Sequence, residues 1–585
     1  MSLSENSPGY ELGEEFHAIA PQCFPSSYAK APAVLARDHG GFSIVPFAPH
    51  RILAQHIPKT TLWQANSPPS ALFLYRLRGY DGGDSGIGLH TVWEEEDARM
   101  ATTQGKFRRY EMLIDGEFAS AGEMLEVVNP ATEEVVSAFP NAPVEIAALA
   151  VEAAVKAQRP WAALPPIRRA AYLRELSALL RSNRDFLSRV ITEEQGKVLA
   201  LAQVEVDCAA DTMDYMAEFA RRIEGEILPS DRPGENILHF KAPLGVVAAI
   251  LPWTFPLYHL VRKLSPALIA GNTVVLKPSS QAPNSALEFA RLVSKSSLPN
   301  GIINLITGEG AVLGRALASH AEVGMVSLTG SAQTGMEILR AAADNLTKVN
   351  LELSGKAPAI VMDDADMDLA VKAIRTSRIF NSGQACNSVE RVFVHHVVAD
   401  EFIARIAEAM RKTIVGNPLL PETEMGPLIG KKHLEAVAAA VRRALRNGAE
   451  LLCGGGESEF NCGYYYPPTV LANCHPQSAI MQQEILGPVL PIATFKTLDE
   501  AIQLANDCDY GLAASLFTRS LDTAMRAANE LKCGEVYLNR EAFESVNGYH
   551  TGWRRSGIGG ADGRHGLEEY LQSRVVYMNY NLNKQ

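Results

Sequence analysis

Residues 244–253 read LGVVAAILPW, and three similar apolar runs follow: GNTVVLKPS (271–279), GIINLITG (301–308) and EVGMVSLTGS (322–331). Each run is short, rich in β-branched residues and closed by Gly, Pro or Ser. A stretch with helical spacing of apolar residues follows each of them. Strands that alternate with helices form parallel sheets with helices on both faces. The segment therefore predicts a doubly wound α/β domain of the Rossmann type.

The same alternation extends in both directions from this segment. On the N-terminal side, VNPATEEVVSAFP (128–140) predicts paired strands, and VEIAALAVEAAVKAQRPWAAL (144–164) predicts a helix. On the C-terminal side, five further strand-like runs indicate a second α/β domain. They are APAIVMDDAD (357–366), ERVFVHH (390–396), VLPIATF (489–495), GLAASLFT (511–518) and EVYLNR (535–540).

The composition is that of an ordinary globular protein, because 47% of the 585 residues are hydrophobic and 21% are charged. A net charge of -12 argues against a nucleic acid or an anionic membrane as partner. No apolar stretch reaches the roughly 20 residues needed to span a bilayer, and the N-terminus lacks a secretory apolar core. The eight cysteines are sparse, and Cys453, Cys462 and Cys474 lack the close spacing of zinc ligands. We expect a reduced cytoplasmic protein without a metal site.

Residues 1–105 differ from the rest, since prolines interrupt every short apolar cluster and no period is sustained. Such a segment buries too little apolar surface to offset the entropy of ordering. We therefore predict a disordered N-terminal extension. Met100 begins MATTQGKFRRYEMLIDGEF, a natural start for the folded part, so we expect residues 1–99 to be dispensable.

Two segments carry candidate catalytic residues. In NSGQACNS (381–388), small neighbours of Cys386 let a substrate and main-chain amides approach the thiol, as a cysteine nucleophile requires. In LELSGKAP (351–358), Glu352 lies between leucines, a setting that desolvates a carboxylate and raises its pKa toward that of a general base. Taken singly, a cysteine such as Cys386 is more often a packed core thiol than a nucleophile, and Glu352 could be a salt-bridged strand end.

Two further strand ends suit a dinucleotide. Lys277 ends the strand of TVVLKPS, where its ammonium can contact ribose hydroxyls or phosphate. In LTGSAQTG, Gly330 and Ser331 end a strand just before a helix, so that free amides face a pyrophosphate. This is not the GxGxxG fingerprint, and alone it is weak evidence.

Taken together, the segments resemble the aldehyde dehydrogenase superfamily from about Tyr110 to Tyr580. The motifs that carry the resemblance are LPWTFP (251–256), GNTVVLKPS, LTGS (328–331), LELSGKAP, NSGQACNS and QEILGPV (483–489). Three longer segments are most similar to bacterial lactaldehyde/glycolaldehyde dehydrogenases: YMAEFARRIEGEILPSDRPGENILHFK (215–241), NLTKVNLELSGKAPAIVMDDAD (345–366) and NREAFESVNGYHTGWRRSGIGGADGRHGLEEYLQ (539–572).

The resemblance implies a dinucleotide-binding domain over 106–224 and 244–354, and a catalytic domain over 355–569. Residues 225–243 and 570–585 would form a β-extension that joins subunits into a homodimer or homotetramer. It also implies that Cys386 attacks the aldehyde and that Glu352 activates water to hydrolyse the resulting thioester. Cofactor contacts are expected at Trp253, Lys277, Ser280, Gly330, Ser331, Glu484 and Leu486. Substrate contacts are expected from Arg262, Phe543 and His550.

Four positions depart from the family pattern. Thr254 stands where the family has the asparagine that donates to the oxyanion, and loss of such a donor typically costs roughly 100- to 1,000-fold in turnover. Leu486 replaces a phenylalanine near the nicotinamide, and Ser354 replaces a glycine beside the general base. Ser280 stands where NAD-preferring members have a glutamate, so it removes a charge that would repel a 2′-phosphate and offers a donor to it. NAD and NADP both remain open.

The leading hypothesis is NAD(P)-dependent oxidation of a small aldehyde, α-hydroxylated ones included, to its acid. A weakly active or non-catalytic dinucleotide-binding homologue is the alternative that Thr254 favours. A semialdehyde dehydrogenase is the third possibility, and it needs a further cation beside the substrate that the sequence does not place.

Overall fold

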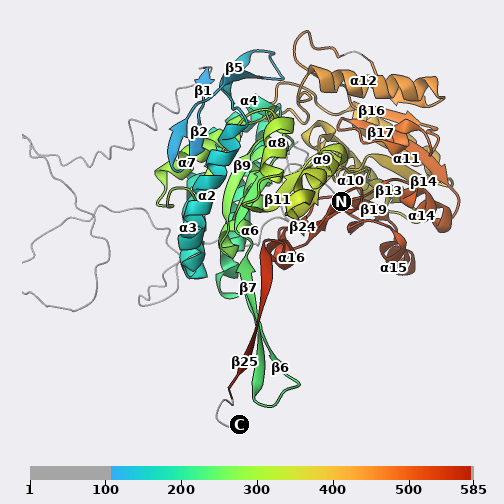
Figure 1. Cartoon of the computed structure of the whole chain (residues 1–585). Coiled ribbons are helices and arrows are strands. Elements are labelled where there is room, and N and C mark those ends of the chain that lie inside the picture. The colour runs from blue at the N-terminus through green and yellow to red at the C-terminus, as the bar shows by residue number, and fades with distance from the viewer. Residues whose placement is uncertain (1–106, 457, 581–585) are drawn as a thin grey trace, which may run out of the picture. The chain divides into compact units, whose positions relative to one another are not determined.

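A computed structural model describes residues 107–456 and 458–580 (Figure 1). The extension predicted over residues 1–105, together with Met100, lies outside the described residues. Two large sheets and a three-stranded ribbon dominate the described part. No helix in these ranges is long and apolar enough to cross a membrane.

The first large sheet has the strand order β23-β12-β11-β8-β9-β10-β2-β3. Its members are β2 (Met112–Ile114), β3 (Glu117–Ala119), β8 (Val246–Ile250), β9 (Thr273–Lys277), β10 (Ile303–Leu305), β11 (Val323–Thr329), β12 (Lys348–Glu352) and β23 (Gly557–Ile558). The five strands from β12 to β10 are parallel, which confirms the predicted doubly wound sheet. Their carboxyl ends, with Lys277, Thr329 and Glu352, therefore share one edge of the sheet.

Both faces of this sheet are covered, because successive side chains of a strand point to opposite sides. Val247 and Ala249 of β8 belong to one apolar cluster, and Val246 and Ala248 belong to another. The helices of this half are α2 (Glu145–Ala163), α3 (Pro166–Ser182), α4 (Arg184–Gln195), α5 (Leu199–Ala217), α6 (Pro256–Ala270), α7 (Asn284–Lys295), α8 (Gly310–Ala318) and α9 (Ala332–Ala342), with the short η2 (Glu218–Arg221) and η3 (Ala343–Asn345).

The second large sheet has the order β15-β16-β17-β14-β13-β19-β20, and only β15 runs antiparallel to its neighbour. Its members are β13 (Pro358–Val361), β14 (Arg391–His395), β15 (Glu450–Cys453), β16 (Thr469–Ala472), β17 (Val489–Phe495), β19 (Ala513–Phe517) and β20 (Glu535–Leu538). Its helices are α10 (Met367–Ile379), α11 (Ala399–Arg411), α12 (Lys431–Arg446), α13 (Ala479–Gln482), α14 (Leu498–Asn506) and α15 (Leu521–Glu530), and η4 (Phe380–Gly383) follows α10.

Smaller elements complete the described part. A long antiparallel ribbon of β6 (Glu226–Pro229), β7 (Glu235–Pro243) and β25 (Leu571–Asn579) extends away from the first large sheet (Figure 1). The strands β1 (Arg108–Arg109), β4 (Glu123–Val128) and β5 (Val135–Asn141) form a third small sheet. The last part of the chain holds the pairs β18 (Tyr510–Gly511) with β22 (Trp553–Arg554) and β21 (His550–Thr551) with β24 (Gly560–Ala561), and the helix α16 (Gly563–Glu568).

One strand pairing joins the two halves at the site. β23 pairs antiparallel with β12, so that Gly557 lies opposite Glu352. The segment that contains His550 and Asp562 flanks β23 in the chain and is thereby brought against the end of the first sheet.

Candidate active site

Cys386 lies in a tight loop between η4 and β14. The loop begins with three left-handed residues, Asn381 (φ 48°), Ser382 (φ 57°) and Gly383 (φ 74°). A side chain at Gly383 would place its Cβ 2.3 Å from the Gly487 carbonyl oxygen, so only glycine fits there. The buried Arg378 guanidinium holds the loop by donating to backbone carbonyls. The acceptors include Gly383 at 2.7 Å, Val389 at 2.8 Å and Ile485 at 2.9 Å.

The two predicted catalytic segments touch at Gly355. A Cβ on Gly355 would lie 2.3 Å from the Cys386 carbonyl oxygen, so this glycine permits the close approach of the two backbones. Gly355 follows Glu352 by three residues. The structure therefore brings the loop of Cys386 against the end of β12.

Thr254 is held beside this loop by its backbone. Its carbonyl oxygen accepts hydrogen bonds from Lys197 Nζ at 2.9 Å and from Asn381 Nδ2 at 3.0 Å. Lys197 in turn forms an ion pair of 2.5 Å with Glu205, and neither side chain is exposed. Glu205 also accepts the first amides of α6, including that of Leu257 at 3.0 Å. This pair was missed in the sequence analysis. The stretch KVLALAQVE (197–205) could have indicated it, because Lys197 and Glu205 are the charged residues that enclose an otherwise mostly apolar run.

Glu352 is ion-paired, and the expectation of a raised pKa is wrong. Its carboxylate accepts from Lys263 Nζ at 2.7 Å and from the Thr329 hydroxyl at 3.2 Å, and Arg262 Nη1 lies 3.9 Å away. Burial raises the pKa of Glu352, but the charges of Lys263 and Arg262 outweigh it and hold the pKa well below its usual range. The segment LELSGKAP does not indicate this partner, because Lys263 comes from α6 and the segment's own cation, Lys356, is paired with Glu390.

Arg262 is buried and bound by carboxylates. Its Nε donates to Asp562 at 3.1 Å, its Nη2 contacts the same carboxylate, and its Nη1 lies 3.3 Å from Glu544. Glu544 in turn accepts from the Asn387 amide at 2.6 Å. Arg262 is thus linked through Glu544 to Asn387, the residue that follows Cys386. Most of the hydrogen-bond donors of Arg262, which was predicted to contact substrate, are already engaged.

His550 lies directly beside the nucleophile candidate. The Cys386 side chain is close enough to this ring to raise the pKa of His550, and the ring's Nδ1 lies 3.1 Å from Glu535 Oε2. Phe543, the third predicted substrate residue, packs on Phe380 with ring centroids 4.3 Å apart, and Phe380 stacks on Phe255 at 5.4 Å. An aromatic wall and a set of polar groups therefore flank the same loop.

The strand ends predicted to hold a dinucleotide fit that group. Ser331 caps α9 by accepting the Thr334 amide at 3.1 Å, which leaves the other first-turn amides of this eleven-residue helix without helical acceptors. A Cβ built on Gly330 meets only the Leu328 side chain, at 3.6 Å. The Gly330 amide, however, donates to the Glu352 carbonyl oxygen at 3.1 Å, so the expectation that this amide is free for a pyrophosphate is wrong. Lys277 Nζ donates to the Pro278 carbonyl at 3.1 Å and has two further donors. Burial lowers the pKa of Lys277 to about 8.

Ser280 and Glu484 have protein partners that the sequence did not indicate. The single proton of the Ser280 hydroxyl is donated to the Gly308 carbonyl at 2.8 Å, so in this arrangement it is not free to donate to a 2′-phosphate. Glu484 accepts from the Ser354 hydroxyl at 2.7 Å and from the Gly355 amide at 3.2 Å. Burial raises the pKa of Glu484 to about 7. Ser354, which departs from the family pattern, thus fixes this carboxylate.

Trp253 and Leu486 share a neighbour. The rings of Trp253 and His433 meet edge to face with centroids 5.5 Å apart, and His433 Nε2 contacts the Leu486 carbonyl oxygen. Segments 251–256 and 483–489 are therefore packed together through α12.

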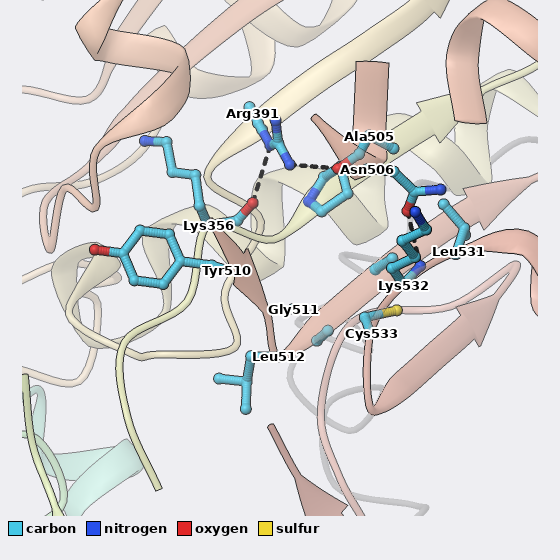
Figure 2. Close-up of a pocket in the computed structure, with 13 residues that line it drawn as sticks. Lys356, Arg391, Ala505, Asn506, Tyr510, Gly511, Leu512, Leu531, Lys532 and Cys533 are labelled. Atoms are coloured by element: carbon cyan, nitrogen blue, oxygen red, sulfur yellow. Dashed lines mark hydrogen bonds between the residues drawn. The ribbon is translucent and has the colours of Figure 1, made fainter. Parts of the chain in front are cut away.

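Figure 2 shows a cavity that lies apart from this chemistry. Its lining comes mainly from 505–514 and 531–533 and includes Arg391 and Cys533. The Arg391 guanidinium is bound to carbonyls, among them Lys356 at 3.0 Å and Ala505 at 2.6 Å, and burial raises the pKa of Cys533 to about 12. Such a thiol stays protonated near neutral pH. None of the predicted site residues lines this cavity.

A parallel sheet with a dinucleotide-compatible edge, beside a thiol and buried carboxylates, is compatible with a dinucleotide-dependent oxidoreductase. The model of the aldehyde dehydrogenase family matches residues 118–576. The chain belongs to this family and is an aldehyde dehydrogenase of the EC 1.2.1 class that uses NAD or NADP.

Two relatives and the crystal structure of one of them illustrate the similarity. Lactaldehyde dehydrogenase of Escherichia coli is 52% identical over 80% of this chain and 98% of its own length. D-glyceraldehyde dehydrogenase (NADP(+)) of Thermoplasma acidophilum is 37% identical over 80% and 96%. The crystal structure of the E. coli lactaldehyde dehydrogenase matches with a TM-score of 0.80 and 52% identity, over 81% of this chain and 100% of that one.

Proposed function

We propose that the protein oxidises a small α-hydroxylated aldehyde to its carboxylic acid, with Cys386 as nucleophile. The observation that carries this is the surroundings of the thiol. His550 contacts it, Asn387 and Glu544 form the adjacent polar pair, and Phe543 closes an aromatic wall. A hydroxyl beside the carbonyl would find both donors and acceptors there. Lactaldehyde and glyceraldehyde, named in two of the relatives, both carry such a hydroxyl.

Each of these residues has a separate role in the proposed reaction. The Cys386 thiolate attacks the carbonyl carbon, a C–S bond forms, and the oxygen becomes an oxyanion. The Cys386 amide and the Thr254 hydroxyl donate to that oxyanion. Conversion of the thiohemiacetal to a thioester releases a hydride, and a nicotinamide held at this edge of the sheet would supply the hydride acceptor. Glu352 then takes a proton from the water that hydrolyses the thioester. An ion-paired carboxylate is a weak base, so we infer that Glu352 leaves Lys263 for this step.

Lys277, Ser280, Gly330 and Ser331 would hold the dinucleotide, with its pyrophosphate at the start of α9. Trp253, Glu484 and Leu486 would lie toward its nicotinamide end. The preference between NAD and NADP turns on Ser280, which carries no charge against a 2′-phosphate but has committed its proton to Gly308.

The test is a panel of aldehydes with either cofactor, followed by the absorbance of the reduced nicotinamide. Glycolaldehyde and lactaldehyde should give higher kcat/KM than propanal, which lacks only the hydroxyl. Cys386→Ala should abolish turnover and leave cofactor binding intact, whereas Cys462→Ala, at an exposed thiol elsewhere, should change neither. More than a few per cent of activity in Cys386→Ala would overturn the assignment.

The same panel separates the alternatives. A non-catalytic homologue, the hypothesis that Thr254 favours, would bind NAD or NADP and turn over no aldehyde. A semialdehyde dehydrogenase would prefer glutarate semialdehyde, for which two relatives in Pseudomonas are named. Arg262, which was expected to contact the substrate, is already bound by Asp562 and Glu544, which argues against its holding a substrate carboxylate.

We also propose that the ribbon of β6, β7 and β25 joins copies into a homodimer or homotetramer. Both outer strands of the ribbon are edges, and they carry exposed apolar side chains. Ile227 is 75% exposed and Tyr577 67%. Light scattering of the intact protein against Ile227→Lys tests this, because a charge on the edge should shift the mass toward the monomer.

A further inference from the structure

The first observation concerns one side of the His550 ring. His550 is buried in β21, with 1% of its side chain exposed, and its Nδ1 lies 3.1 Å from Glu535 Oε2. An ionised carboxylate can only accept a hydrogen bond. Nδ1 therefore carries the proton of this contact, and in a neutral ring Nε2 is left as a bare acceptor. Tyr537 donates to the same Glu535 oxygen at 3.0 Å and fixes the carboxylate.

The second observation concerns the other side of the ring. The Cys386 side chain lies close enough to the His550 ring to raise the pKa of His550. Because Glu535 engages Nδ1, Nε2 is the nitrogen that remains for the thiol. The order carboxylate, imidazole, thiol is the arrangement in which a ring can take a proton from a nucleophile while the carboxylate stabilises the imidazolium.

We propose that His550 is a catalytic residue that accepts the Cys386 proton, and that Glu535 is the positioning residue that holds the ring for it. In this step the S–H bond breaks, an Nε2–H bond forms, and a thiolate faces an imidazolium before the aldehyde arrives. No other reactant is consumed. The inference rests on the proposed role of Cys386 as nucleophile, and it gives His550 a task beyond contact with the substrate.

The charges around the ring favour the imidazolium. The charged groups that interact with the ring include four carboxylates, those of Glu535, Glu352, Glu544 and Asp562, and negative charge stabilises an imidazolium. The positive charge of Arg262 opposes this effect, and His259 is a further titratable neighbour. Burial lowers the pKa of His550, but the charge of Glu535 and the nearby Cys386 side chain outweigh burial. The pKa of the ring therefore lies well above its usual range. The ring can thus keep the proton at neutral pH.

The test is alkylation of Cys386 by iodoacetamide in the full-length protein, with the rate read from the mass of the Cys386 peptide. An ordinary thiol, with a pKa of about 8.5, is only about 1% ionised at about pH 6.5. The wild type should still react at that pH. His550→Gln should react at least about 10-fold more slowly there, yet within about two-fold of the wild type near pH 9.5, where any accessible thiol is ionised.

Two further variants make the result specific. Glu535→Gln should slow alkylation in the same direction at about pH 6.5 and leave the rate near pH 9.5 unchanged, because it only destabilises the imidazolium. His395→Gln is the matched control. It removes another buried histidine, bound to the Lys496 carbonyl at 3.0 Å, and should match the wild type at both pH values.

Equal rates for wild type and His550→Gln at the lower pH would overturn the proposal, as would an equal loss at both pH values. If His550→Gln does not fold, the wild-type profile decides, because a rate that falls 10-fold per pH unit below about pH 8.5 is that of an unassisted thiol. Alkylation is read without aldehyde or cofactor. Failure of Cys386→Ala to abolish turnover would therefore sink the proposed function and leave this result standing.

Discussion

Replacing Lys263 by methionine tests how Glu352 is held. The pair is closed to solvent, since Lys263 is 0% and Glu352 4% exposed, and the two charged atoms lie 2.7 Å apart. Methionine has a similar length and no charge. It leaves a buried carboxylate with the Thr329 hydroxyl at 3.2 Å and Arg262 at 3.9 Å. Removing one partner of a buried pair costs about 3–5 kcal/mol, and the remaining contacts place the expected loss near 3 kcal/mol.

The dependence of stability on pH follows from the direction in which the pKa of Glu352 is shifted. In the wild type the pKa of Glu352 in the folded protein lies below its ordinary value of about 4.5. The stabilisation is therefore complete above about pH 4.5 and is lost only as the pH falls through the lower, folded value. In Lys263→Met, burial is no longer outweighed and the pKa rises. The variant can then relieve its unpaired charge by binding a proton, so its deficit should shrink as the solution is acidified.

Urea unfolding followed by tryptophan fluorescence, at about pH 8 and about pH 5.5, measures this deficit as a difference between midpoints. Adding Glu352→Gln to Lys263→Met should recover more than half of it, because the buried charge is gone. Lys156→Met is the control. Lys156 is 78% exposed and pairs with Asp115 at 3.2 Å, so its loss should cost no more than about 1 kcal/mol. The reasoning would be refuted if Lys263→Met lost no more stability than Lys156→Met, or if its loss of stability were the same at both pH values.

Three other changes probe positions singled out by the sequence. Thr254→Asn should raise kcat about 10-fold, because Lys197 and Asn381 hold the backbone at Thr254 and a carboxamide reaches further; an unchanged kcat would mean that the pocket has compensated. Ser280→Glu should raise the ratio of kcat/KM for NAD to that for NADP, and a wild type that ignores NADP would contradict the inference. A chain that starts at Met100 should fold, assemble and turn over like the full chain, and loss of solubility on truncation would show that residues 1–99 contribute to the fold.

The periodic parts of the fold were predictable from the sequence. The apolar runs over 244–331 became β8, β9, β10 and β11, because alternation between short β-branched runs and helical stretches leaves few other topologies. The ends of these strands, with Lys277 and Ser331, then had to share an edge. Cys386 could be identified because the small residues around it are a local feature.

Long-range pairings were not predictable. Lys263 is 89 residues from Glu352, and the pattern of LELSGKAP supplied burial without showing which cation lies opposite, so the predicted sign of the pKa shift was wrong. Ser280 is a similar case, because its proton is committed to a carbonyl 28 residues away. His550 was singled out, but only β21, β20 and the Cys386 loop together show what its two nitrogens face. Motifs identify groups, whereas their pKa values depend on partners from other elements.

The two acid–base groups of the site are thus kept in opposite states. Lys263 holds Glu352 as an anion that is a weak base until it is released, so Glu352 is poorly suited to take the thiol proton at the start of the cycle. The Cys386 side chain lies close enough to the His550 ring to raise the pKa of His550, and Glu535 favours the protonated form of that ring. The two proposed roles are therefore separate: the His550 ring ionises Cys386 before the aldehyde binds, and the Glu352 carboxylate activates the water that attacks the thioester.

This separation predicts that His550→Gln slows formation of the thioester and that Glu352→Gln slows its hydrolysis. Rapid-quench measurement of the acylated protein would distinguish the two, since Glu352→Gln should accumulate the acyl form and His550→Gln should not. Accumulation in both variants, or in neither, would show that one group performs both proton transfers.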